Sequence, residues 1–376
     1  MVKKALFSLL AAVLLLSCSS GPKTIVVNNF IDLDRFGEIV EVKIAGTNCD
    51  FNTKSFILKD KEGTEIPYQI LYDDNKNAHT LIFQADVWAK STNEYTLTEG
   101  KPQEVKAKVF ARYIPERKDD FAWENDLAAY RMYGPALAKE NPSNGVDIWL
   151  KRTDELIVDK FYHDELVNKL SYHVDHGKGL DCYKVGHTLG AGGIAPYTDK
   201  LWVGKHYNKQ EVLVNGPLRS IFTLTYDSVR VDNTFYKQTI TITVDAGSIL
   251  NKAVVRFEGV DASFKLAGGI FLHDGKGVQL ADVNNNIIAY AEDAVSDAGI
   301  PSGRNYIGVY MPGINIETKQ EGEHLLILSN YTSGDEFTYY FGGGWSKWKF
   351  PSDDNWFNAM VHFNQSITSP LSVNIK

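Results

Sequence analysis

The sequence predicts an all-β protein in which a large antiparallel β-sandwich follows a smaller β-sandwich segment. Short runs of alternating apolar and polar residues recur along the chain, turn residues separate them, and long helical patterns are absent. In "KQTITITVDAG" (237–247), Ile240, Ile242 and Val244 face one side and the intervening threonines face the other. This period of two is typical of a half-buried antiparallel strand. Short strands at this density favour a sandwich.

The beginning of the chain reads as a targeting signal. Lys3 and Lys4 precede an apolar run (5–16) that is too short to span a bilayer, and the run ends in "LLSC". This ending resembles the lipobox of bacterial lipoproteins. We therefore expect a lipoprotein signal peptide over residues 1–18, with Cys18 lipidated and the mature protein held on a membrane. An ordinary secretory signal with a chance cysteine is the alternative.

Two β-rich regions follow this signal. Strand-like runs at 24–30, 37–46, 54–60, 79–87 and 93–100 predict an N-terminal β-sandwich, with a tether, over residues 19–112. The step at 61–64, Lys-Glu-Gly-Thr, predicts a hairpin between its two flanking runs. Longer runs and most aromatic residues predict a larger sandwich over 113–376. Within it, the stretch 124–134 is either a helix or a turn into a strand.

Charge and cysteine content narrow the function. The chain has 39 Lys and Arg against 47 Asp and Glu, a formal charge of −8, and it lacks a basic run, which argues against nucleic-acid binding. A local basic cluster can still bind an anionic substrate. Besides Cys18, the chain contains Cys49 and Cys182, which either pair or stay as separate buried thiols. The cysteine spacing is not that of a zinc site.

Titratable residues are concentrated in "YHVDHGKGLDCYKVGHTLGAGG" (172–193). A metal site would use His173, Asp175 and His176, with Asp181 as a further ligand. On a strand, however, residues 173 and 175 share a face while 176 points away. We therefore favour His173 and His176 as proton carriers, and expect no resident metal, with a divalent cation as the alternative. The same segment supplies further candidates for one wall of a substrate site: Tyr183, Lys184 and His187.

Two further groups of side chains suit an acidic sugar substrate. Arg131, in "AYRMYGP", has a planar fork suited to a carboxylate, and Tyr133 lies beside it in sequence; the alternative is that Arg131 pairs with Asp126 or Glu124. Glu124 is also a possible base, although the acids of "DDFAWEND" more often form a solvated turn. Trp345 and Trp348 offer flat faces for sugar rings, or else pack in the core. A loop histidine, His273, is a weaker candidate for the same cleft.

Three segments resemble a known family. They are "PERKDDFAWENDLAAYRMYGPAL" (115–137), residues 145–193, and "VNGPLRSIFTLTY" (214–226), with "TYYFGGGWSK" (338–347) near the end. They are similar to domain-of-unknown-function family 4861, lipoproteins of Gram-negative systems that degrade glycans. The resemblance implies the antiparallel supersandwich of galactose mutarotases. It also implies a role on pectin-like, uronate-containing glycans.

From these observations we expect a periplasmic, membrane-anchored protein that acts on uronate-containing oligosaccharides. The leading hypothesis is lyase-type or hydrolase-type cleavage, with His173, His176, Arg131 and Tyr133 as catalytic residues. Glu124, Tyr183, Lys184, His187, Trp345 and Trp348 are the expected substrate-binding residues. No cofactor is expected. Two alternatives remain: a non-catalytic glycan-binding lipoprotein, in which the tryptophans matter more than the histidines, and a mutarotase-like sugar epimerase using a histidine and Glu124.

Overall fold

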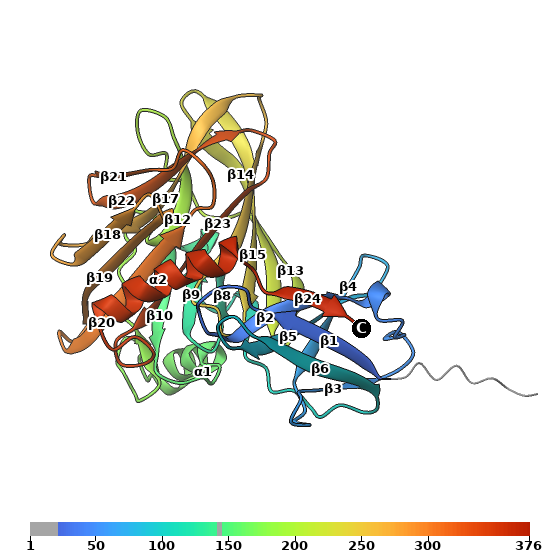
Figure 1. The fold of residues 1–376 in the computed structure, drawn as a ribbon. Helices are drawn as coiled ribbons and strands as arrows, with labels where there is room; N and C mark the ends of the chain where they lie inside the picture. Colours follow the sequence, from blue (N-terminus) through green and yellow to red (C-terminus); the bar gives the residue numbers. More distant parts are fainter. Residues whose placement is uncertain (1–21, 141–144) are drawn as a thin grey trace, which may run out of the picture.

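The computed structural model describes residues 22–140 and 145–376 and confirms the all-β prediction. The expected signal peptide and the lipidated Cys18 lie outside the described residues. Figure 1 shows a small sandwich, in blue, beside a larger body. Within the two described ranges, no helix is both long and apolar enough to cross a membrane.

The small sandwich is built of two antiparallel sheets that enclose a core including Val27, Leu58, Phe83 and Leu97. One sheet has the order β24-β1-β6-β3 and the other has the order β2-β5-β4. The strands are β1 (Lys23–Asn28), β2 (Arg35–Lys43), β3 (Phe56–Lys59), β4 (Tyr68–Tyr72), β5 (Ala78–Val87), β6 (Thr92–Glu99) and β24 (Ser372–Ile375), and a short helix, η1 (Ile44–Gly46), follows β2.

The turn predicted at 61–64 is present, but the two strands that flank it do not pair with each other as a hairpin. A bridge joins Lys59 to Glu65, but β3 pairs with β6 while β4 pairs with β5 in the other sheet. The chain therefore crosses between the layers at this turn. Strand pairing also differs from the expected division at residue 112, because the C-terminal strand β24 pairs with β1, from Ile25↔Ile375 to Asn28↔Ser372.

The large sandwich has an eight-stranded sheet as one layer, in the order β13-β14-β15-β16-β23-β20-β19-β18. Ile240, Ile242 and Val244 of β15 are buried against the other layer, as the alternation predicts. The strands are β13 (Lys209–Asn215), β14 (Arg219–Val231), β15 (Thr234–Asp245), β16 (Asn251–Glu258), β18 (Val278–Asp282), β19 (Ile287–Val295), β20 (Pro301–Tyr310) and β23 (Phe337–Trp345).

The opposite layer consists of two sheets joined by a parallel bridge between Val146 and Gly190. Their orders are β11-β10-β9-β8-β7 and β12-β17-β22-β21. The first contains β7 (Phe110–Ile114), β8 (Asp120–Glu124), β9 (Ala128–Met132), β10 (Val146–Lys151) and β11 (Gly179–Asp181); the second contains β12 (Ala191–Tyr197), β17 (Ser263–Phe271), β21 (Glu317–Glu321) and β22 (His324–Thr332). Residues 124–134 thus form a turn into a strand and no helix.

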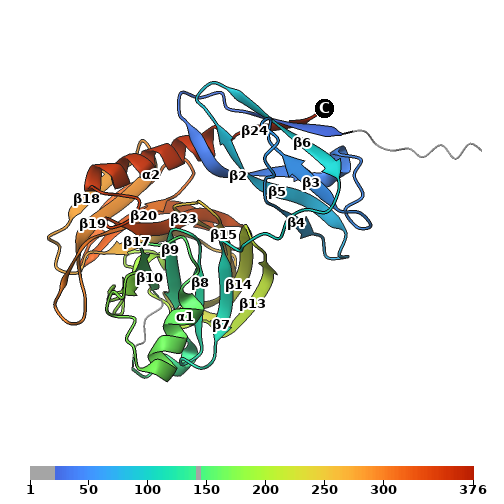
Figure 2. The same cartoon turned by 90° about the horizontal axis from the view of Figure 1, so that it is seen from below.

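Two helices cover outer faces of the large sandwich. α1 (Val158–His163), continued by η3 (Asp164–Asn168), covers the five-stranded sheet, and a short turn of helix, η2 (Pro135–Leu137), follows β9. α2 (Asp353–Thr368) lies across the eight-stranded sheet, as Figure 2 shows from below. Trp356 and Met360 of α2 fit closely against β20 because residue 308 is glycine; a Cβ there would lie 2.3 Å from the Met360 sulfur.

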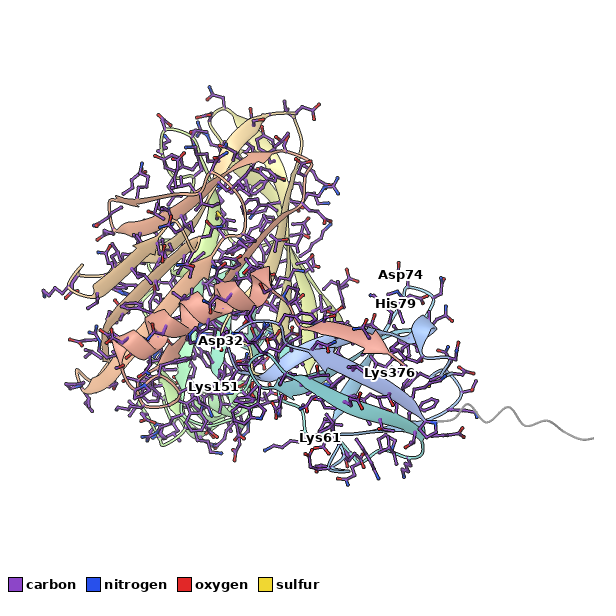
Figure 3. The ribbon with its side chains drawn as sticks, in the orientation of Figure 1. Asp32, Lys61, Asp74, His79, Lys151 and Lys376 are labelled. Carbon is purple, nitrogen blue, oxygen red and sulfur yellow. The ribbon has the colours of Figure 1, made fainter. Side chains whose placement is uncertain are left out.

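Two glutamines of the small sandwich contribute to its docking on the large one. Gln69 Oε1 accepts from the backbone N–H groups of Leu218 (2.9 Å) and Arg219 (2.8 Å). Gln84 Nε2 donates to the carbonyl oxygens of Gly37 (2.9 Å) and Ala246 (3.3 Å). These bonds satisfy backbone groups at turns that meet between the two bodies. Figure 3 shows other polar side chains of the small sandwich, Lys61, Asp74 and His79, at its surface.

We predict that Gln84→Ala lowers the free energy of unfolding by about 1–3 kcal/mol, because it leaves the Ala246 carbonyl and the Lys108 amine without their partner. Urea denaturation measures this. The exposed Gln279, which makes no side-chain hydrogen bond to another described residue, is the matched control, and Gln279→Ala should change stability by less than about 0.5 kcal/mol. Equal effects of the two substitutions would show that docking does not depend on Gln84.

Candidate functional site

A layer of buried charge lies on the outer face of the five-stranded sheet. The inner face packs Phe121, Trp123 and Ile148 into the main core. The outer face is covered by α1 and by Tyr172, so polar side chains there are removed from water and need internal partners. Six charged residues on these strands are at most 2% exposed: Asp120, Glu124, Arg131, Asp147, Lys151 and Asp181.

Arg131 is at the centre of this layer. It lies opposite Asp147 across the β9–β10 pair, and its Nε donates to Asp147 Oδ2 (2.9 Å). Its Nη2 donates to Asp181 Oδ2 (2.8 Å) and its Nη1 to the Tyr172 hydroxyl (3.2 Å). The ring of Tyr133 lies 4.7 Å from the guanidinium carbon. The chain's own groups therefore occupy the fork that the sequence analysis assigned to a substrate carboxylate.

This burial corrects the predicted role of Arg131. At 2% exposure it is out of reach of a sugar unless the covering loop moves. The alternative of an internal ion pair is the one observed, but the partners are Asp147 and Asp181 and not Asp126 or Glu124. Tyr133 is half-buried and its hydroxyl accepts from Arg131 Nη2 (3.4 Å), so it is part of the same cluster.

The two carboxylates have altered acidity. Burial raises the pKa of Asp147 above its ordinary value, and Arg131 opposes that shift only in part. Burial raises the pKa of Asp181 well above its ordinary value; the nearby charge of Asp147 raises it further, while Arg131 lowers it. The Asp147 Oδ1 atom is buried with no hydrogen-bond partner in the described ranges. One guanidinium between two such carboxylates favours retention of a proton on the pair.

Glu124 has a structural role here, unlike the binding or base role predicted for it. Its carboxylate accepts from Lys151 Nζ (2.7 Å) and from the backbone N–H groups of Ile157 (2.8 Å) and Val158 (2.7 Å), where α1 begins. Both partners of the ion pair are buried, and Lys151 is labelled in Figure 3. Glu124 is therefore not available to a substrate.

His173 connects this buried layer with the surface. Its Nδ1 lies 2.9 Å from the Asp181 carbonyl oxygen and 3.6 Å from Asp181 Oδ2. Asp297 Oδ2 is 3.8 Å from the same nitrogen, and the side chain is 31% exposed. Nε2 has no partner among the residues that the structure describes. A backbone acceptor at Nδ1 fixes the ring and leaves Nε2 as the atom able to exchange a proton with a bound molecule.

A lysine and a second histidine lie next to this point. The side chain of Lys184 is 77% exposed, and its Nζ lies 3.7 Å from Asp297 Oδ1. Asp297 therefore lies between Lys184 and His173. His273 contacts Glu292 Oε2 (2.8 Å) through Nδ1 and the Lys184 carbonyl oxygen (2.9 Å) through Nε2. Both ring nitrogens of His273 are thus occupied. We call His173, Asp297 and Lys184 the rim triad.

The predicted residues therefore do not all meet. Arg131 and His173 both contact Asp181, and Tyr133 contacts Arg131. The exposed His176 instead bonds the Ser171 carbonyl oxygen (3.0 Å) and makes no hydrogen bond to Arg131 or Tyr133. Other candidates lie apart: His187 is exposed, and Tyr183 is buried against His273, with a centroid distance of 4.8 Å.

The expected sugar-facing tryptophans are placed differently. Trp345 is 1% exposed and its Nε1 donates to the Ser302 carbonyl oxygen (2.6 Å), so it is a core residue. Trp348 is half-buried, with Lys349 Nζ 4.7 Å from its ring centroid. Cys49 and Cys182 are free thiols, the second of the two interpretations, and burial raises the pKa of Cys182.

The sequence analysis missed three acids of the site, Asp147, Glu292 and Asp297, and considered Asp181 only as a metal ligand. One signal was present. In "VDIWLK" (146–151), Asp147 and Lys151 lie four residues apart, on the same face of a strand whose other positions are large and apolar. Charges in an otherwise apolar strand indicate a buried polar layer. Among the described residues, no group of three or more His, Cys, Asp or Glu side chains is arranged to hold a metal ion.

Comparisons with known proteins bear on both family and fold. The family described as "Domain of unknown function (DUF4861)" matches residues 27–373. "Uncharacterized protein P7" of Formosa agariphila is 27% identical over 394 aligned residues, which cover 99% of this chain and 98% of that protein. An α-mannosidase from Enterococcus faecalis V583 is similar in structure, with a TM-score of 0.50 and 9% identity over 94% of this chain and 46% of that one.

A protein in glycosyl hydrolase family 38 from Enterococcus faecalis has a TM-score of 0.45 at 9% identity, covering 94% of this chain and 47% of its own. This chain thus spans less than half the length of either solved structure. At such identity the likeness to the α-mannosidase concerns the fold alone.

We predict that Arg131→Met lowers the free energy of unfolding by about 3–5 kcal/mol, because it leaves Asp147 and Asp181 without their cation. Arg131→Lys should lie between this variant and the wild type, since lysine keeps the charge but lacks the fork. Urea denaturation gives the values. The half-exposed Arg256, which pairs with Glu258, is the control, and Arg256→Met should cost less than about 1 kcal/mol. If Arg131→Met lowered the free energy of unfolding by no more than Arg256→Met does, this account would be contradicted.

His273 should make stability depend on pH. Burial by itself lowers the pKa of His273, but the hydrogen bond and charge of Glu292 outweigh it, and the pKa is raised overall. The folded state therefore binds the proton more tightly than the unfolded chain. This contribution is complete below the unfolded pKa of about 6.5 and is lost as pH rises through the folded value.

We accordingly expect His273→Gln to be less stable than the wild type at pH 6, with the difference shrinking towards pH 8.5. Thermal unfolding at several pH values measures it. The same substitution at the exposed His163 is the control for replacing a histidine by glutamine. A constant difference across this range would mean that the Glu292 contact does not depend on protonation.

Proposed function

The chain belongs to the DUF4861 family, and on that premise we propose that it cleaves uronate-containing oligosaccharides by β-elimination. The observation that carries the proposal is His173: its Nδ1 is held by the Asp181 carbonyl oxygen, its Nε2 has no partner among the described residues, and Asp297 links it to the exposed Lys184. A half-exposed imidazole with one nitrogen fixed and one free suits proton transfer near neutral pH.

The reaction needs a cation as well as a base. Neutralising the substrate carboxylate makes the adjacent C5 proton removable. Lys184, whose amine is exposed, neutralises the substrate carboxylate, the role that the sequence analysis gave to Arg131. His173 Nε2 then accepts the C5 proton, the electron pair forms the C4–C5 double bond, and the C4–O bond breaks. The departing oxygen takes a proton from water.

The positions of the Asp and Glu side chains in this site fit elimination better than hydrolysis. A glycosidase places two carboxyl groups on either side of the bond, about 5–9 Å apart. Asp147 and Asp181 are buried around Arg131, and Glu124 caps α1. Asp297, at 50% side-chain exposure, is the carboxylate of the rim triad. We assign it to orienting His173 and Lys184, and we assign Tyr133 to positioning Arg131.

Cellular placement belongs to the same proposal. We propose a lipid on Cys18 and the periplasmic side of a Gram-negative envelope, where oligosaccharides released from larger glycans are within reach. The likeness to the α-mannosidase is a precedent for this fold in a carbohydrate-active protein and does not bear on cellular placement.

One observation favours a second candidate, a protein that binds glycans without cleaving them. Arg131 is paired internally with Asp147 and Asp181, so the exposed part of the site offers one cation, Lys184, and hydrogen-bonding groups on His173 and Asp297. Such a protein needs hydrogen-bonding groups and an exposed cation but no base.

An ultraviolet assay distinguishes the two candidates, because elimination creates an unsaturated product that absorbs. We expect His173→Ala to lower the rate of product formation from oligogalacturonates by at least about a hundredfold, since it removes the base. The exposed His163 on α1 serves as control, and His163→Ala should keep the wild-type rate. Circular dichroism checks folding of each variant.

Equal rates in the His173→Ala variant and the wild type would refute the assigned role. If the wild type binds oligogalacturonates in calorimetry but forms no absorbing product, the binding-only candidate is correct and the lyase proposal is not.

A further inference from the structure

A cavity of about 490 Å³ lies where three elements meet: the N-terminal sandwich, the eight-stranded sheet and helix α2. Figures 1 and 2 both show the C-terminal part of α2 reaching the small sandwich at this place. We call it the junction cavity. Its walls come from residues between 33 and 41, residues between 243 and 252, and side chains of α2 between Ala359 and Ile367, together with Arg219 and Tyr340. Sites for small molecules are commonly found at such boundaries and have volumes of this order.

The walls of the junction cavity are tied together by hydrogen bonds. Arg35 is paired with Glu38 and donates to the Ser369 (3.0 Å) and Ser366 (3.3 Å) carbonyl oxygens at the end of α2. Arg219 bonds Asp245 within the large sandwich (2.6 Å) and Glu41 of the small one (2.5 Å). Together with the Gln84 contacts, these bonds connect the walls that the small sandwich, the eight-stranded sheet and α2 contribute.

An exposed aromatic pair lies at one wall. Phe36 lines the cavity and is 53% exposed. Trp88 is not among the lining residues, but it packs edge-on against Phe36, with ring centroids 4.7 Å apart, and is 63% exposed. Neither ring belongs to a hydrophobic core of the described residues. Flat apolar faces beside polar groups match the CH-rich faces and hydroxyls of a sugar ring.

The cavity also offers polar groups without partners. The Lys252 amine, the Tyr340 hydroxyl and the His362 ring make no hydrogen bond or ion pair with any other residue in the described ranges. They are available to hydroxyl groups of a ligand. The charges of the lining are nearly balanced, with four carboxylates (Asp34, Glu38, Glu41 and Asp245) against three permanent cations (Arg35, Arg219 and Lys252). This balance disfavours a polyanion and suits a neutral ligand.

We propose that the junction cavity is a second carbohydrate site, which binds neutral pyranose units of a glycan with Phe36 and Trp88 as the stacking platform. The site is built from different residues than the rim triad and lies on the α2 side of the large sandwich, whereas His173 lies on the α1 side. Its role is to hold a glycan on the protein, without chemistry. The proposal goes beyond the proposed lyase activity and does not require it.

Isothermal titration calorimetry tests this with neutral oligosaccharides of six glucose, mannose, galactose or xylose units. We expect at least one of the four to bind the wild-type protein. Phe36→Ala and Trp88→Ala should each weaken that binding about tenfold or more, since each removes a stacking face. Trp88→Phe should retain most of it. The exposed Tyr72, which does not line the cavity, is the matched control, and Tyr72→Ala should bind like the wild type.

The experiment is repeated in the His173→Ala background, so that the two proposals can fail separately. Binding that survives His173→Ala but is lost with Phe36→Ala supports the junction cavity whether or not the protein is a lyase. The proposal is overturned if none of the four oligosaccharides binds the wild type. It is also overturned if binding is unaffected by Phe36→Ala and Trp88→Ala in variants whose thermal unfolding remains normal.

Discussion

The pairing of one guanidinium with two carboxylates is the constraint on which the five-stranded sheet depends. Its inner face packs on the main core, and α1 covers its outer face, so both sides are shielded from water. A sheet covered on both sides normally consists of apolar residues. Here Asp147 and Asp181 can be buried only because Arg131 lies between them. The position of Tyr172 over this cluster, and of His173 next to it in sequence, follows from that arrangement.

The same layer connects packing with chemistry. The Asp181 backbone carbonyl and side chain both approach His173 Nδ1, so the imidazole is oriented by a residue whose own place is set by Arg131. Glu124 and Lys151 perform a comparable structural task at the start of α1. Polar groups that look catalytic in the sequence therefore divide into a buried supporting set and a small exposed set.

Strand alternation predicted the fold class well, because a period of two is a local property of the sequence. It identified β15 and the two-sandwich organisation of the chain's strands. It failed where partners are distant: the turn at 61–64 crosses between layers, and β24 joins β1. For the site, local composition gave His173 and Lys184 as candidates, and their roles stay predictions. It did not reveal that Arg131 and Trp345 are buried, since burial depends on which helix or strand covers them.

The pairing of β24 with β1 has a consequence for how the chain is made. Ile25 is among the first residues of the structure to leave the ribosome, whereas its partner Ile375 is among the last. Until residues 372–375 have been synthesised, β1 has an open edge able to pair with another chain. Such long-range closure slows folding and prolongs the exposure of unpaired edges. The small sandwich, although first in sequence, is thus completed last.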